Sequence, residues 1–314
     1  MIVVRAPAHL HAGNFDLTGD LGRLYGTVGF AINYPLEVEV HKCDGIEVSD
    51  AWAYEYAKRL IERFDLKGLK IDIRRSIPRL VGLGYNTTLA LSIGLAASKL
   101  YDLNLSIEEV ALIVQRGTIT ALGVYALKVG GFIVEGGFKI DKREKMVPPL
   151  IFHRTIPEDW YFIVAIPYKP REHIMRERER EDDVLKELKV MPREMSSELS
   201  RIVLMKIIPS IIEGDLKSFG EGLTLFNAIL GDFWREYQGG RYCHSIVEEG
   251  INLLLSKAYC ACQSSWGPAF YGIVKGEKKA SALARELKDF IEAKGGGEVF
   301  YVKPDNQGAI IMEE

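Results

Sequence analysis

Hydrophobic and polar residues follow two different periods along the first half of this chain. Strict alternation at residues 36–40 and 69–73 predicts strands with one buried and one solvated face. Apolar residues at helical spacing predict helices over residues 50–66 and 89–100. The signature Ser106-Ile107-Glu108-Glu109 predicts the start of a further short helix, because a serine and a glutamate three residues apart can cap each other's backbone.

The second half repeats this mixture of strands and helices. Residues 160–166 read as a buried strand, and further elements are expected as helices at 197–213, 216–231 and 245–256, followed by a strand at 270–274, a helix at 278–294 and a strand at 298–304. A proline-rich stretch at 148–159 suggests a boundary, so we expect domains at 1–153 and 154–314. The pattern predicts an α+β fold rather than a doubly wound parallel sheet.

Composition narrows the class of protein. The 314 residues are 47% hydrophobic and 26% charged, as in a soluble globular protein, and the net charge of −3 gives no basic field for nucleic acid or an anionic membrane. The N-terminal residues read as a strand rather than a signal peptide, and no run approaches the roughly 18 apolar residues of a membrane span. We therefore expect a cytoplasmic protein with small-molecule partners, no nucleic acid and no membrane; a homodimer is expected from base rates alone.

The stretch at residues 77–88 carries the strongest chemical signal. It leads from a predicted strand through two glycines directly into an apolar helix, so unpaired N–H groups and the positive end of the helix dipole meet at one point. Such a turn predicts an anion site, most simply for phosphate. Its spacing matches neither the P-loop nor the dinucleotide fingerprint. The expected phosphate-binding residues are Gly82, Leu83, Gly84, Tyr85, Asn86, Thr87 and Thr88. The alternative is a tight turn in which glycine serves packing only.

A second glycine-rich loop near the N-terminus holds Asp16, Asp20 and Arg23. A carboxylate and a guanidinium on one turn can hold a polar ligand, because arginine binds carboxylate or phosphate in a planar fork. Taken alone, the loop is explained equally by a surface ion pair of little energy.

Histidines and cysteines give no metal site. His9 and His11 share one face of a predicted strand, but no third ligand is apparent, so we expect no metal bound to protein side chains there. Cys243, Cys260 and Cys262 lack metal-ligand spacing and are expected to be buried, unreactive thiols.

The stretch at residues 263–272 combines hydroxyl, amide and indole groups with glycine and proline. Its donors beside exposed glycine backbone suit a pyrophosphate or a ribose. The substrate-binding residues expected here and on the first strand are His11, Gln263, Ser264, Ser265, Trp266 and Gly267. A capped turn with one packed tryptophan is the alternative.

Together these segments resemble the GHMP small-molecule kinase superfamily and, within it, the β-ribofuranosylaminobenzene 5′-phosphate synthase family. The matching motifs cover almost the whole chain in order, and the motif at residues 263–268, which contains the tryptophan, is specific to that family. They are Leu21-Gly22-Arg23-Leu24-Tyr25-Gly26, the turn from Pro78 to Gly84, Arg116-Gly117, the glycine-flanked residues 130–137, Arg176-Glu177-Arg178-Glu179, Tyr237-Gln238-Gly239-Gly240 and Gln263-Ser264-Ser265-Trp266-Gly267-Pro268.

The resemblance implies both a fold and a reaction. The fold would be an N-terminal domain like ribosomal protein S5 domain 2, followed by a ferredoxin-like domain. Enzymes of the family join 4-aminobenzoate or 4-hydroxybenzoate to phosphoribosyl pyrophosphate, with loss of CO₂ and pyrophosphate, in archaeal methanopterin biosynthesis. A Mg²⁺ ion would accompany the pyrophosphate.

Site roles follow from the resemblance residue by residue. Asp16 would face the developing cation or orient the aromatic acid, and Arg23 would hold a carboxylate or phosphate. The glycine turn would hold the pyrophosphate, and Ser264 and Ser265 would close over the ribose phosphate. Tyr85 places a ring where the family usually has a small residue, so the ring is expected to restrict the approach of phosphate.

One position separates this chemistry from that of the superfamily's kinases. Those enzymes commonly carry a Ser-Gly-x-Asp word whose aspartate is the base, and the aligned word here is Thr120-Ala121-Leu122-Gly123. Gly123 cannot accept a proton, which disfavours a kinase using that base. An ATP-dependent small-molecule kinase and a non-catalytic phosphate-ligand-binding relative remain the alternatives.

Overall fold

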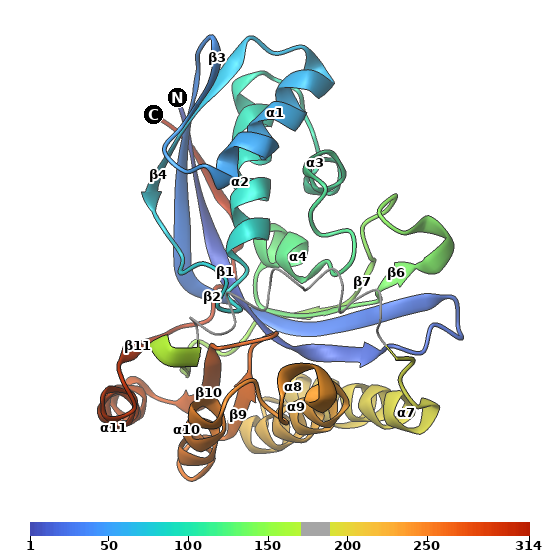
Figure 1. Cartoon of the computed structure of the whole chain (residues 1–314), viewed down its shortest axis with the longest axis vertical. Helices are drawn as coiled ribbons and strands as arrows, with labels where there is room; N and C mark the ends of the chain where they lie inside the picture. The colour runs from blue at the N-terminus through green and yellow to red at the C-terminus, as the bar shows by residue number, and fades with distance from the viewer. Residues whose placement is uncertain (171–188) are drawn as a thin grey trace.

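The computed structural model describes residues 1–170 and 189–314, which form two β-sheets, each covered by helices (Figure 1). The first sheet runs β12-β1-β2-β4-β3, and β5, β6 and β7 extend it beyond β2. Its strands are β1 (Ile2–Asp16), β2 (Arg23–Lys42), β3 (Gly45–Val48), β4 (Gly68–Arg75), β5 (Phe132–Glu135), β6 (Phe138–Lys139), β7 (Leu150–Arg154) and β12 (Ile310–Glu313). β1 and β2 pair along nearly their full length, so the loop at 17–22 lies at one end of the sheet.

Four α-helices lie on one side of this sheet (Figure 1). They are α1 (Trp52–Phe64), α2 (Tyr85–Leu100), α3 (Ile107–Val114) and α4 (Leu122–Val129), and the short 3₁₀ turn η1 (Ile140–Lys142) follows β6. α2 is buried almost all round because it packs between β1 and β2 on one side and α1, α3 and α4 on the other. α3 begins at the predicted capping box, in which Ser106 and Glu109 each bond the other's backbone N–H.

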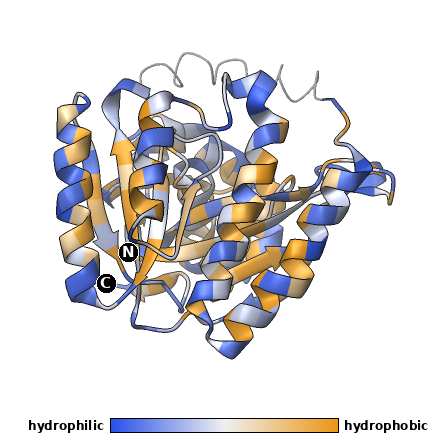
Figure 2. Ribbon diagram, turned by 90° about the horizontal axis from the view of Figure 1, so that it is seen from below, coloured by the Kyte–Doolittle hydropathy of each residue, from blue (hydrophilic) through white to orange (hydrophobic). Residues whose placement is uncertain are grey.

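The second sheet runs β11-β8-β10-β9, and all its pairings are antiparallel. Its elements are β8 (Trp160–Pro167), α7 (Arg193–Ile202), the π-helical turn η3 (Val203–Ile207), α8 (Ile208–Glu213), α9 (Leu216–Gln238), α10 (Ser245–Leu255), β9 (Cys260–Gln263), β10 (Phe270–Lys275), α11 (Glu277–Ala293) and β11 (Gly297–Val302). This strand order is that of a ferredoxin-like sheet. Mainly apolar strands lie between helices that carry apolar and polar faces (Figure 2). The predicted α+β fold class is confirmed.

The two halves share a large core, and the second half has a further cluster of its own on the other face of its sheet. Phe30 of β2 packs on Phe162 of β8 and on Tyr271 of β10, with ring centroids 5.2 and 6.0 Å apart. The chain also returns to its start, because β12 pairs with β1 and the N-terminal amine donates to the Glu314 carbonyl at 3.0 Å. β7 of the first sheet ends at Arg154 and β8 of the second begins at Trp160, and the expected domains 1–153 and 154–314 stay a prediction.

Several element boundaries differ from the sequence expectation. α2 begins at Tyr85 rather than at residue 89, because the polar residues 86–88 form its first turn. α9 continues past Gly231 to Gln238; this glycine allows close packing, since a Cβ there would lie 2.5 Å from the Arg241 carbonyl oxygen. The short strands β9 and β12 were not predicted. The charged run at 171–188 was expected to be a solvated helix or mobile loop. It lies outside the described residues, and so does the family motif at 176–179 that it contains.

Candidate active site

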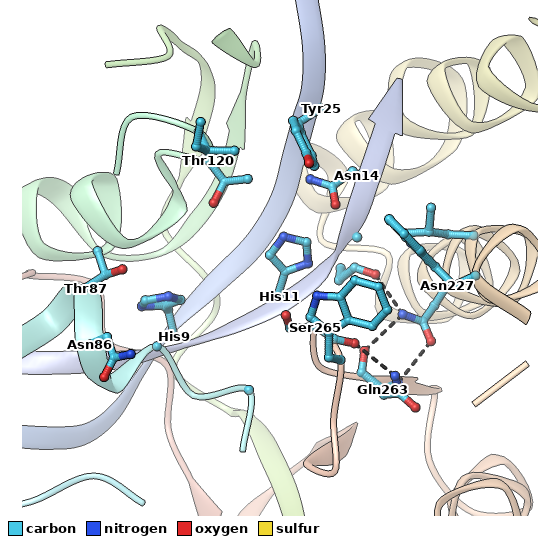
Figure 3. A pocket seen from close by; sticks show the side chains of 18 of the residues that line it. His9, His11, Asn14, Tyr25, Asn86, Thr87, Thr120, Asn227, Gln263 and Ser265 are labelled. Atoms are coloured by element: carbon cyan, nitrogen blue, oxygen red, sulfur yellow. Dashed lines mark hydrogen bonds between the residues drawn. The ribbon is translucent and has the colours of Figure 1, made fainter. Parts of the chain in front are cut away.

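A cavity of ≈ 430 Å³ lies between the two halves of the molecule (Figure 3). Its wall is formed by β1, the glycine turn and the start of α2, residues 115–120, one face of α9 and the loop after β9. We call the part around Gly82 to Thr87 and Thr118 to Thr120 the glycine end. We call the part around Trp234, Gln238, Arg241 and Trp266 the tryptophan end.

The start of α2 supplies unpaired backbone donors at the glycine end. Its N-cap is Gly84, with φ of 78° and no side chain to accept from the first N–H groups. Gly82 also has a positive φ, of 92°, and a Cβ there would lie 2.3 Å from the Ser264 carbonyl oxygen. Both positions therefore require glycine, and the resulting turn leaves α2 open to an anion.

A second helix begins beside the first. The N-cap of α4 is Ala121, which likewise has no side chain to cap the helix. A Cβ added at Gly123 would meet Thr87 Cγ2 at 2.6 Å and His9 Cε1 at 2.9 Å, so the first turns of α2 and α4 are in contact. Of the two helices, α2 presents its first turn to the cavity, because Asn86 and Thr87 line it. The first turn of α4 does not line the cavity, and the buried Glu135 carboxylate interacts with the Ala121 backbone there.

The histidines of β1 lie on the wall as neutral rings. Burial lowers the pKa of His9 to about 4, and burial together with repulsion from His9 lowers the pKa of His11 to about 3. His9 Nδ1, Asn86 Oδ1 and Thr88 Oγ1 are buried and have no hydrogen-bond partner among the described residues. Such unpaired buried polar atoms are costly unless a ligand or water satisfies them.

Tyr85 does not obstruct the glycine end. Its side chain is buried and its hydroxyl donates to Asp50 Oδ2, which also pairs with Arg79. Burial and the neighbouring carboxylate raise the pKa of Tyr85. The phenol is therefore turned into the protein, and the expectation that it restricts phosphate is wrong.

The loop after β9 is held by a buried polar network. The Ser264 hydroxyl donates to the Gly82 carbonyl at 2.6 Å and accepts from the His11 N–H at 3.0 Å. Asn227 of α9 donates to the Ala12 and Gln263 carbonyls and accepts from the Gln263 N–H (Figure 3). These bonds join β1, the glycine turn, α9 and β9 into one wall.

The tryptophan end carries aromatic and cationic groups. The rings of Trp234 and Trp266 meet at 60° with centroids 4.6 Å apart. Arg241 donates through Nε and Nη2 to the Asp232 carboxylate, at 3.0 and 2.8 Å. The Gln263 side chain links Gln238, the Ser265 carbonyl and the Cys243 N–H, which fixes this loop against α9.

The charge of the wall is one-sided. Among the described residues that line the cavity there is no aspartate or glutamate, whereas Arg116 and Arg241 are present. Arg116 is fixed by donating to the Tyr56 hydroxyl at 3.0 Å and by lying over its ring. The cavity therefore favours anions and offers no carboxylate as a proton acceptor.

The structure brings most of the predicted site residues together. On the wall lie His11, Gly82, Gly84, Tyr85, Asn86, Thr87, Gln263, Ser265 and Trp266. Leu83, Thr88, Ser264 and Gly267 are buried directly behind it. Ser264 uses its hydroxyl within the protein and supports the wall, whereas Ser265 lies on it.

Asp16 and Arg23 lie farther along the β1–β2 hairpin and do not line the cavity. Asp16 accepts from Thr18, and Arg23 donates to the Gly137 carbonyl at 2.9 Å, so the two residues have different partners. Asp16 is two residues beyond the wall residue Asn14 on the same strand, which places it on the same face. Their catalytic roles stay predictions.

The wall residues that were not predicted as site residues include Arg116, Asn227, Trp234, Gln238 and Arg241. Three of them recur at helical spacing along α9 at 227, 234 and 238, on the face that also carries Gly231. Polar and aromatic side chains on an otherwise apolar helix face are the signal that could have found them.

In the part of the chain that the structure describes, no group of three or more histidine, cysteine, aspartate or glutamate side chains could hold a metal ion. Within the same residues, none of the helices combines the length and apolar character needed to cross a membrane. Cys243, Cys260 and Cys262 are buried, which confirms that expectation.

Two family models match the chain, the GHMP kinases N terminal domain over residues 51–130 and the GHMP kinases C terminal domain over residues 207–293. Among solved structures, the homoserine kinase of Cytophaga hutchinsonii superposes with a TM-score of 0.63 at 14% identity, covering 99% of this chain and 97% of its own. The mevalonate kinase of Methanococcus jannaschii gives 0.61 at 14% identity, covering 97% of this chain and 98% of its own. These likenesses show the shared fold.

Relatives over nearly the full chain identify the family within the GHMP kinase superfamily. β-Ribofuranosylphenol 5′-phosphate synthase of Methanothermobacter thermautotrophicus is 30% identical over 342 residues, with 99% of both chains covered. The protein of the same name from Archaeoglobus fulgidus is 29% identical, with 94% of both chains covered. The chain therefore belongs to the β-ribofuranosylphenol 5′-phosphate synthase family of the GHMP kinase superfamily.

Proposed function

We propose that this protein transfers the phosphoribosyl group of phosphoribosyl pyrophosphate to 4-hydroxybenzoate, with release of CO₂ and pyrophosphate, in methanopterin-type pterin biosynthesis. The relatives are named for a ribosylated phenol phosphate, the product that this acid would give. The observation that carries the proposal is the wall itself. The open N-terminus of α2 and two arginines face a cavity whose described lining has no carboxylate.

The reaction releases an anionic leaving group and needs no base, and a cavity wall without carboxylates among its described residues suits both requirements. The C–O bond to pyrophosphate breaks as the aromatic ring attacks the ribose anomeric carbon through the ring carbon that bears the carboxylate. Loss of CO₂ then breaks the ring–carboxyl bond and returns the electron pair to the ring. The net reaction moves no proton, so the site must stabilise the departing pyrophosphate and needs no base.

A kinase has a different requirement. It removes a proton from the substrate hydroxyl, and the position at which superfamily kinases carry an aspartate is Gly123 here. The contacts of Gly123 with Thr87 and His9 leave no room for a side chain.

Magnesium fits this cavity as a companion of the substrate. Mg²⁺ usually keeps several waters and binds substrate phosphates with few protein ligands. Asn86 Oδ1, which has no partner among the described residues, and the Thr87 hydroxyl are the neutral oxygens that would complete its coordination at the glycine end. Bound there, the ion would neutralise charge on the leaving pyrophosphate.

The test combines binding and turnover. The protein is mixed with phosphoribosyl pyrophosphate, Mg²⁺ and carboxyl-labelled 4-hydroxybenzoate, and labelled CO₂ and pyrophosphate are measured; 4-aminobenzoate replaces the acid in a parallel assay. A thermal-shift panel compares phosphoribosyl pyrophosphate with ATP, because a ligand at 100 times its Kd stabilises by about 2.7 kcal/mol. Stabilisation by ATP alone, with ADP formed from an alcohol, would identify a kinase. Saturable binding without product would identify a non-catalytic relative.

Variants of the hairpin test the two predicted catalytic residues. Asp16→Asn and Arg23→Gln should each lower kcat/KM by roughly 30- to 1,000-fold, if their charges stabilise the transition state by about 2–4 kcal/mol. Asp20→Asn is the matched control, because Asp20 is an exposed carboxylate of the same loop that pairs with Arg193. A control variant as impaired as the other two would show that only the loop's fold matters.

A further inference from the structure

The pair formed by Trp234 and Trp266 differs from ordinary core aromatics. The two indoles come from different elements, α9 and the loop after β9, and meet at 60° with centroids 4.6 Å apart. Both are only partly buried and both line the cavity (Figure 3 shows the surrounding wall). A tilted pair with surface left open can accept a third ring by stacking or by an edge contact.

The protein holds this pair rigidly. Phe233 and Tyr237 pack against Trp234, with centroid distances of 5.1 and 5.7 Å. Trp266 follows Ser265, whose carbonyl accepts from the Gln263 side chain at 3.0 Å. A fixed aromatic wall binds a ring at low entropic cost, because neither indole has to be ordered on binding.

The two tryptophans lie at the end of the cavity opposite the glycine turn, so the two ends suit different parts of a ligand. The open N-terminus of α2 at the glycine end suits the phosphate groups, which leaves the tryptophan end for the uncharged part of a ligand. Arg241 adds a polar contact there. Asp232 occupies its Nε and Nη2, so Nη1 is the guanidinium nitrogen left for an oxygen atom on the ring.

We propose that Trp234 and Trp266 form the subsite for the ring of the aromatic acid, with Arg241 contacting the oxygen atom para to its carboxyl group. This rests on the proposed function and adds the orientation of the second substrate. The carboxyl-bearing carbon then points toward the glycine end, where the anomeric carbon of the sugar is held. The contact with Arg241 serves to orient the ring, because the para oxygen donates electron density to the ring as the new bond forms.

The experiment measures both substrates separately. Binding of 4-hydroxybenzoate to the whole protein is titrated by calorimetry with Mg²⁺ and inorganic pyrophosphate present, and KM is determined for each substrate. Trp266→Ala and Trp234→Ala should each raise the Kd for 4-hydroxybenzoate roughly tenfold, and Trp266→Phe should restore most of the affinity, because it keeps an aromatic face. The Kd for Mg²⁺–phosphoribosyl pyrophosphate should change less than about twofold, which also reports that the variants are folded.

Two further variants sharpen the result. Arg241→Met should weaken binding of 4-hydroxybenzoate but not of benzoate, which lacks the para oxygen. Trp52→Phe is the matched control, because Trp52 is exposed on α1 and does not line the cavity.

The outcomes separate this inference from the proposed function. Unchanged affinity for 4-hydroxybenzoate in both alanine variants, with wild-type turnover intact, overturns the subsite and leaves the function standing. If the wild type makes no product and the variants lose affinity for ATP instead, the pair holds a nucleotide base and both proposals fail. Loss of affinity for the aromatic acid alone supports the subsite.

Discussion

Ser264 should stabilise the wall of the cavity through its buried hydroxyl. In Ser264→Ala the His11 N–H loses its acceptor and the Gly82 carbonyl loses its donor, both in a buried environment. Each unsatisfied group costs about 1–3 kcal/mol, so we expect the free energy of unfolding to fall by about 2–6 kcal/mol in total. Unfolding entropy of about 2.1 cal/mol/K per residue over 314 residues converts this to a Tm lower by roughly 3–9 °C.

Calorimetric melting of the purified protein measures this change, and Ser265→Ala is the matched control. Ser265 is the next residue along the chain, but it is exposed on the wall, so removal of its hydroxyl should move Tm by less than about 1 °C. The KM for phosphoribosyl pyrophosphate should rise in Ser264→Ala, because the Gly82 turn loses its anchor. Equal melting temperatures for the two variants would refute the reasoning.

Three further predictions concern the glycine end. Gly123→Asp should form no ADP and should lower transferase activity at least roughly tenfold, measured as CO₂ release, because the new side chain displaces His9. Burial lowers the pKa of His9 to about 4 and of His11 to about 3 from 6.5, so the unfolded state binds more protons below pH 6.5. Each histidine should therefore reduce the free energy of unfolding by up to about 1.4 kcal/mol per pH unit as pH falls from 6.5 toward 4. In urea-unfolding measurements at several pH values, the free energy of unfolding of His9→Gln should fall less steeply with decreasing pH than that of the wild type. Tyr85→Phe should lose about 1.5–3 kcal/mol of stability with the bond to Asp50, without weakening pyrophosphate binding by titration; weakened binding would contradict the inward placement of the ring.

The pattern of residues predicted many individual elements because their signals are local, whereas the arrangement of the two sheets was expected only from the family resemblance. The Ser106 cap, the apolar run of α2 and the strand at 160–166 each carry their pattern within one element. The strands β9 and β12 were not predicted because four residues hold too few alternations of apolar and polar residues. The end of α9 was placed too early, because Gly231 does not end the helix but allows close packing against Arg241.

The site was predictable where one segment carries the chemistry and not where distant segments combine. The glycine turn and the loop after β9 were found because glycines, hydroxyls and an indole stand together. Arg241 and Trp234 became part of the wall only through packing of α9 against β1 and β9. The spacing of residues 227, 234 and 238 marks a polar and aromatic helix face, but it does not say which strands that face packs against. The inward turn of Tyr85 likewise depends on Asp50, which lies 35 positions earlier.

The pairing of β12 with β1 makes the first sheet depend on a strand that is synthesised long after β1. Until β12 is made, β1 presents an open row of N–H and C=O groups between Ile2 and Arg5, the kind of edge that recruits strands from other chains. A protein truncated before Ile310 would keep that edge exposed. Residues 310–313 therefore cover an edge that would otherwise favour aggregation, although they do not line the cavity.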